Sequence, residues 1–85
     1  MKFYYKPSFV RQYRLLESAL QQEVKEKINF FRYPKNQQQL KVHKLGGQLK
    51  GKYSFSVNYR YRVVFVYGDT EMVILLAVGD HAVYK

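Results

Sequence analysis

The feature of this sequence that most constrains its fold is an alternation of apolar and polar residues that runs from residue 53 to residue 67. Neighbouring side chains of a β-strand point to opposite faces of the sheet, so this alternation predicts a hairpin with one buried face. The pattern leaves Arg62 on the opposite face. The positions predicted to be buried are Tyr53, Phe55, Val57, Tyr59, Tyr61, Val63, Phe65 and Tyr67.

A helical pattern precedes the hairpin, in residues 8–33, which contain neither glycine nor proline. One helix over this segment would be longer than a compact domain of this size is wide, so we expect a break. Ser18, followed three residues later by Gln21, has the form of a capping box that starts a second helix. We therefore predict helices at Ser8 to Leu16 and Ala19 to Arg32, with Pro34 ending the second. The apolar residues spaced by three and four are Phe9, Tyr13, Leu16, Leu20, Val24, Ile28 and Phe31.

Three further segments complete the predicted fold. Lys2 to Tyr5 is a short aromatic strand, Leu40 to Leu45 is a short irregular strand, and a turn at Gly68-Asp69 leads into the apolar segment Met72 to Val78. The last segment should be the strand most buried on both faces. The 85 residues suit one domain, residues 1–85, of the α+β class, in which both helices pack on one face of a mostly antiparallel four-stranded sheet.

The positive charge is concentrated where the hairpin pattern lies. The formal net charge is +9, and residues 41–67 contain six basic residues and no acidic residue. A basic surface on a rigid sheet favours a polyanionic partner, either nucleic acid or an acidic protein. The sixth of these basic residues is Arg62, and we expect the other five to contact RNA: Lys41, Lys44, Lys50, Lys52 and Arg60.

The absence of cysteine indicates a protein of a reducing compartment, since no disulfide can form. The N-terminal sequence MKFYYKPSF has an apolar run far shorter than the core of a signal peptide. We therefore expect a cytoplasmic protein that is neither exported nor inserted in a membrane.

The residues that could carry chemistry suit one reaction class. Arg62 lies in an otherwise apolar strand, where a guanidinium favours an anionic partner. With His43, His81, Tyr84 and the lysines, it could serve cleavage of RNA by its own ribose 2′-hydroxyl, which needs proton carriers and cations around the phosphate. The scattered acids have no metal-ligand spacing, and GGQLKGK lacks the spacing of a phosphate-binding P-loop, so we expect no metal and no cofactor.

Two segments resemble a known family. The run HKLGGQLKGKYSFSVNYRYRVVF and the terminal VGDHAVYK are similar to the RelE/ParE superfamily of bacterial toxins, particularly its RelE/YafQ-type branch. The resemblance covers nearly the whole chain. It implies a compact ribonuclease-like fold, cleavage of mRNA in the ribosomal A site without metal, and control by a cognate acidic antitoxin.

The resemblance also implies roles for single residues. Arg62 matches the strand arginine that holds the scissile phosphate, and His81 lies where members carry the general acid. Tyr84 matches an aromatic residue near the C-terminus, and His43 resembles an upstream histidine of YafQ-like members.

The general base is less defined by the motifs. RelE itself has catalytic lysines where this chain has Ser54 and Ser56, and the glutamate of YoeB-like members has no clear match. His43 is our candidate for the base, with Lys44, Lys50 or Lys52 as substitutes.

Two other functions fit the same sequence. Members of the ParE type share the fold and poison DNA gyrase without cleaving RNA. A domain that only binds RNA, with exposed tyrosines stacking on bases, is the third possibility.

Overall fold

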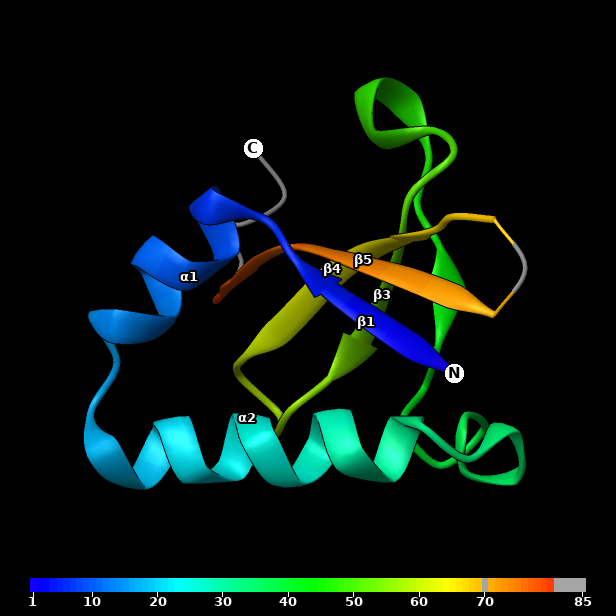
Figure 1. Cartoon of the computed structure of the whole chain (residues 1–85). Coiled ribbons are helices and arrows are strands. Elements are labelled where there is room, and N and C mark those ends of the chain that lie inside the picture. Colours follow the sequence, from blue (N-terminus) through cyan, green and yellow to red (C-terminus); the bar gives the residue numbers. More distant parts are fainter. Residues whose placement is uncertain (70, 81–85) are drawn as a thin grey trace.

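The computed structural model describes residues 1–69 and 71–80. In this part of the chain one strand is followed by two helices and then by four more strands (Figure 1). Two short 3₁₀ turns, Pro34–Asn36 and Gly47–Leu49, lie in the connections. The elements are β1 Lys2–Tyr5, α1 Pro7–Arg14, α2 Ser18–Phe31, β2 His43–Lys44, β3 Tyr53–Ser56, β4 Arg62–Tyr67 and β5 Met72–Gly79.

The two-helix prediction is confirmed, with each helix beginning one residue and ending one or two residues before the predicted positions. The predicted capping box is wrong. Glu17 is the N-cap of α2, and no side chain there bonds the free backbone amides. Gln21 instead donates its side-chain amide to the carbonyl oxygen of Tyr13 at 2.9 Å. Gln21 therefore joins α2 to α1 rather than closing the start of its own helix.

The sheet contains five strands in the order β1-β5-β4-β3-β2. β1 is parallel to β5, and the other three pairings are antiparallel. The predicted α+β class with a mostly antiparallel sheet is confirmed. The predicted number of strands was four, and the sheet has five. The irregular strand predicted at Leu40 to Leu45 is present as β2, and its two residues pair with β3.

β4 is the most buried strand, and the prediction that β5 would be is wrong. β4 lies in the centre of the sheet and has three consecutive buried residues, Val63 to Phe65, which cover both faces. The register between the two strands shifts at residues 64 and 65, so Leu76 of β5 is an extra residue. This bulge changes which residues of β5 face the core. The buried ones are Val73, Leu75 and Val78.

The core lies between α2 and the sheet, and its centre is aromatic. Phe31 of α2 stacks on Phe55 at 4.9 Å between ring centroids and meets Phe65 edge-on at 5.0 Å. All three rings are fully buried. Val24 and Ile28 extend the same helix face at the spacing that the sequence predicted. Figure 1 shows α2 along one side of the sheet.

Helix α1 covers the part of the β5 edge that β1 leaves open. β1 pairs with β5 only as far as Leu75. Beyond it, Ser8 Oγ donates to the carbonyl oxygen of Leu76 at 2.7 Å, and the amide of Val78 donates to Gln12 Oε1 at 2.9 Å. The helix thus satisfies backbone groups that would otherwise form an exposed sheet edge.

The hairpin strand β3 is shorter than the alternation suggests, because a loop begins at Val57. Two positions predicted to be buried are exposed, Tyr59 at 93% and Tyr67 at 45%. The period-two pattern continues through the loop in sequence although the chain there is no longer a strand. No described helix has the length and apolar character of a membrane-spanning segment.

Candidate active site

The strand pairings place four polar side chains on two rungs of the sheet that are separated by one rung. His43 of β2 pairs with Ser54 of β3, and Ser56 of β3 pairs with Arg62 of β4. Phe55, between the two serines, belongs to the core, so Ser54 and Ser56 face away from it. The second face of the sheet therefore carries a histidine, two hydroxyl groups and a guanidinium, with β3 between His43 and Arg62.

His43 is held at both ring nitrogens. Its Nδ1 lies 2.9 Å from the carbonyl oxygen of Lys41, and its Nε2 lies 3.3 Å from Ser54 Oγ. A carbonyl oxygen only accepts hydrogen bonds, so Nδ1 carries a proton. When Nε2 carries none, it can accept from the Ser54 hydroxyl. Ser54 is buried and His43 is exposed. The ring is thus oriented and can exchange a proton at Nε2.

Arg62 is half-buried and has no acidic partner among the described residues. One nitrogen, Nη1, donates to the carbonyl oxygens of Asn58 at 2.8 Å and Tyr61 at 3.1 Å. Nε and Nη2 make no hydrogen bond within the described chain and are not buried. One side of the guanidinium therefore holds the hairpin loop, while the other side is open to a ligand.

The hairpin loop that Arg62 contacts is built around Asn58. Its Oδ1 accepts hydrogen bonds from the backbone amides of Arg60 at 2.9 Å and Tyr61 at 2.8 Å. Its Nδ2 donates to Glu23 of α2 at 3.0 Å. Such side-chain bonds to the following backbone define a turn and here fix the loop against the helix.

A cleft of about 420 Å³ opens beside Arg62. It lies where α2, the connection before β2 and the hairpin loop meet. Sequence reasoning did not identify Lys27, because a lysine within a helical pattern gives no sign of the loop it will face. The lining residues are Lys27, Gln39, Leu40, Lys41, Ser56, Val57, Asn58, Tyr59 and Arg62.

The other predicted RNA-binding residues lie in different places. Lys50 and Lys52 belong to the β2–β3 connection, at the end of that strand pair remote from the Ser56–Arg62 rung. Lys44 is exposed and pairs through its backbone with Tyr53. Arg60 is 3.9 Å from the carboxylate of Asp80. Among the predicted RNA-binding residues that the structure describes, Lys41 alone lines the cleft with Arg62.

Two predicted catalytic residues, His81 and Tyr84, lie outside the described residues. Their roles stay predictions. Within residues 1–69 and 71–80, no group of three His, Asp or Glu side chains could hold a metal ion.

A comparison with protein families gives a match along almost the whole chain. The matching family is described as the RelE-like toxin of type II toxin-antitoxin system HigB, and the match covers residues 2–80. The chain belongs to this family. The predicted membership of the RelE toxin superfamily is therefore confirmed for this HigB-like toxin. A search of curated proteins gave no significant match.

Solved structures of toxins share the fold of the HigB-like toxin. YafQ from E. coli strain BL21(DE3) has a TM-score of 0.79 at 15% identity, covering 95% of this chain and 93% of YafQ. The YoeB/ParE toxin from Agrobacterium tumefaciens has a TM-score of 0.73 at 18% identity, with 95% and 99% covered. A chain of the RelBE2 toxin-antitoxin complex from Mycobacterium tuberculosis has a TM-score of 0.70 at 18% identity, with 94% and 96% covered.

Proposed function

We propose that this toxin is a ribosome-dependent endoribonuclease that inhibits translation by cutting mRNA in the ribosomal A site. The observation that carries the proposal is the combination of an oriented His43 with a half-open Arg62 guanidinium on one sheet face. RNA cleavage through the 2′-hydroxyl needs a proton acceptor and a fixed cation near the phosphate. Family membership supports the same reaction class.

In the proposed reaction, His43 Nε2 takes the proton of the ribose 2′-hydroxyl, and the 2′-oxygen attacks the adjacent phosphorus. The Ser54 hydroxyl occupies Nε2 at the long distance of 3.3 Å, so an RNA hydroxyl can replace it as donor. Lys41 keeps the ring in the tautomer that accepts at Nε2.

The free side of Arg62 then stabilises the additional negative charge on the pentacovalent phosphate. The bond from phosphorus to the 5′-oxygen breaks, and that oxygen receives a proton, for which we propose His81 as the general acid and Tyr84 as a neighbouring aromatic contact. The products are a 2′,3′-cyclic phosphate and a 5′-hydroxyl. No metal takes part in this sequence of steps.

In-vitro translation combined with primer extension tests this function. We expect the purified toxin to stop protein synthesis and to produce breaks within codons of ribosome-bound message. Intact message at saturating toxin would reject the nuclease. A parallel gyrase assay would then separate a ParE-type poison, which causes DNA breaks, from a domain that only binds RNA.

We also propose that an acidic antitoxin neutralises the toxin, since the chain carries a net charge of +9. Carboxylates of the antitoxin would lie near Arg62 and the lysines, or its chain would displace the residues around His81. The toxin similar to this one from Mycobacterium tuberculosis is known in a toxin-antitoxin complex.

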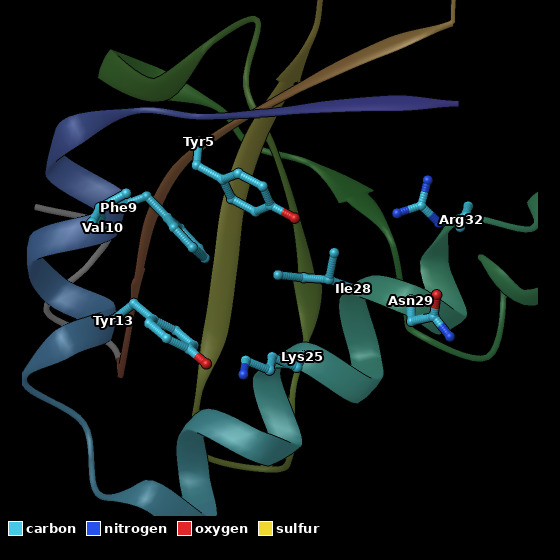
Figure 2. Close-up of a pocket in the computed structure, with 8 residues that line it drawn as sticks. All are labelled: Tyr5, Phe9, Val10, Tyr13, Lys25, Ile28, Asn29 and Arg32. Carbon is cyan, nitrogen blue, oxygen red and sulfur yellow. The ribbon is translucent and has the colours of Figure 1, made fainter.

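A groove on the helix side could anchor the same antitoxin. It has a volume of about 390 Å³ and lies between β1, α1 and α2 (Figure 2). Phe9 forms its floor, with the Tyr5 ring at 5.7 Å and the Tyr13 ring at 6.1 Å. Lys25 and Arg32 also line it. An apolar floor with a cationic rim suits an amphipathic acidic helix.

Co-expression with the neighbouring small reading frame tests the partner. We expect rescue of growth and recovery of a complex. Lys25→Glu should weaken the complex, whereas Lys35→Glu, an exposed lysine away from the groove, should not. Equal binding by both variants would remove the groove from the interface and leave the nuclease proposal unaffected.

A further inference from the structure

The cleft beside Arg62 contains more cationic and aromatic surface than the reaction steps use. We infer that it is a subsite for the nucleotide next to the scissile phosphate, in which Lys27 and Lys41 bind the following phosphate and Tyr59 stacks on the base. This inference rests on the proposed function, because Arg62 is taken to hold the phosphate that is cut.

The charges of the cleft favour a polyanion. Lys27, Lys41 and Arg62 line it together, and no carboxylate is among the lining residues. None of the three cations forms an ion pair within residues 1–69 and 71–80. Glu23 of α2 accepts a hydrogen bond from Asn58 and so supports the loop. Uncompensated cations in a concave site concentrate anions there.

Lys41 connects this cleft directly to the proposed base. Its carbonyl oxygen contacts Nδ1 of His43, while the residue also lines the cleft. Its backbone has φ of 56°, in the left-handed region that lysine rarely adopts. The next residue back, Leu40, is buried and accepts the amide of Ser56 at 2.9 Å. These contacts hold Lys41 in a conformation that has an energetic cost, as is common at functional sites.

Tyr59 provides the stacking surface. It is 93% exposed at the lip of the cleft, on the loop that Asn58 and Arg62 fix. An exposed ring on a fixed loop can stack on a base with little loss of conformational freedom, and such stacking tolerates any base. The cleft volume of about 420 Å³ lies within the range of roughly 300–1,000 Å³ found for ligand sites.

Binding of an RNA that cannot be cleaved tests the subsite apart from catalysis. The probe is a short fluorescent oligonucleotide with 2′-O-methyl groups, followed by anisotropy at several salt concentrations. We expect Lys27→Ala to weaken binding about three- to tenfold and to reduce the salt slope by about one. Tyr59→Ala should weaken it roughly tenfold. Lys27→Arg should bind as the parent does.

The matched controls are Lys25→Ala, on the same helix but lining the other groove, and Tyr33→Ala, an exposed tyrosine elsewhere. Both should bind as the parent does. Parental binding by Lys27→Ala and Tyr59→Ala, in folded protein, overturns the subsite even if mRNA is cleaved. An acidic peptide serves as a second probe. If Lys27→Ala and Tyr59→Ala lose binding to this peptide but keep parental binding to the RNA, the subsite is also overturned. If both variants bind the RNA more weakly than the parent, and the parent cleaves no mRNA, the cleft is supported as an RNA subsite and only the nuclease is rejected.

Discussion

At the scale of single residues, Arg62 combines two functions in one side chain. Nη1 holds the hairpin loop through two carbonyl oxygens. Nε and Nη2 make no hydrogen bond to the described residues and can bind a ligand. A change at this position should therefore affect both stability and cleavage. The ring of His43 is also fixed without a substrate, because Lys41 and Ser54 contact its two nitrogens.

Arg62→Ala should lower the single-turnover cleavage rate on programmed ribosomes by roughly a hundredfold or more, because the charge on the phosphate loses its partner. Loss of the two loop hydrogen bonds should also reduce the free energy of unfolding by about 1–3 kcal/mol. Arg62→Lys should restore only part of the rate, since a point charge lacks the planar fork. Arg11→Ala, on the exposed face of α1, is the control. A parental rate for Arg62→Ala would remove Arg62 from the site.

Tyr67 gives a prediction about pH. Tyr67 is 45% exposed, and the partial burial of its hydroxyl raises its pKa, which the nearby Tyr53 raises further. The unfolded chain ionises at a pKa of about 10, so the native state holds its proton to higher pH. The stabilising effect is complete below about pH 10 and is lost as the pH rises through the native pKa. Tyr67→Phe should show a shallower fall in unfolding free energy than the parent in urea titrations above about pH 10. Tyr4→Phe, an exposed control, should follow the parent, and identical curves for all three would contradict the shift.

At the scale of the elements, α2 supplies the centre of the core. Its side chains Val24, Ile28 and Phe31 are buried, and Phe31 packs on Phe55 of β3 and Phe65 of β4. Helix α1 contacts chiefly β5. The hairpin loop beside the cleft depends on α2 as well, because Glu23 accepts a hydrogen bond from Asn58 and Lys27 lines the cleft. The helix therefore links core packing to the geometry of the site.

Phe31→Ala should destabilise the fold by about 3–5 kcal/mol, because it leaves a cavity between Phe55 and Phe65. That is a large part of the total stability of about 5–15 kcal/mol expected for a domain. The neighbouring Phe30, which is 37% exposed, provides the matched control. Its replacement by Ala should cost no more than about 1 kcal/mol in the same urea unfolding experiment. Equal losses would contradict the assignment of Phe31 to the core.

At the scale of the whole molecule, two groups of basic residues lie in different regions. Lys27, Lys41 and Arg62 share the cleft, while Lys50 and Lys52 lie in the β2–β3 connection. We expect the first region to act on the cleaved strand and the second to contact the ribosome as a field of charge.

Lys50→Ala and Lys52→Ala should weaken apparent ribosome affinity without changing the maximal cleavage rate. The loss should shrink as salt is raised, because such contacts are mainly electrostatic. Titration of ribosomes at two salt concentrations measures this, with Lys35→Ala as the control. A lower maximal rate at saturating ribosomes would place these lysines in the chemistry instead.

The sequence alone was sufficient for the features that depend on local periodicity. The steps of three and four from Phe9 to Phe31 defined both helices, and the alternation around Phe55 and Phe65 placed the hairpin core. The family motifs around Arg62 also indicated the superfamily correctly. Local sequence patterns gave wrong predictions at two residues. Ser18 forms no capping box, and Tyr59, predicted to be buried in a strand, is exposed on a loop.

Only the tertiary structure decided which distant groups meet. It brought Lys27 of α2 to the cleft of Arg62, aimed the Lys41 carbonyl at His43, and closed the edge of β5 with Ser8 and Gln12 of α1. Periodicity reports which face of an element is apolar, and this depends on near neighbours in sequence. The partner of a polar side chain depends on register, bulges and loop paths, which are set by the packing of the whole chain.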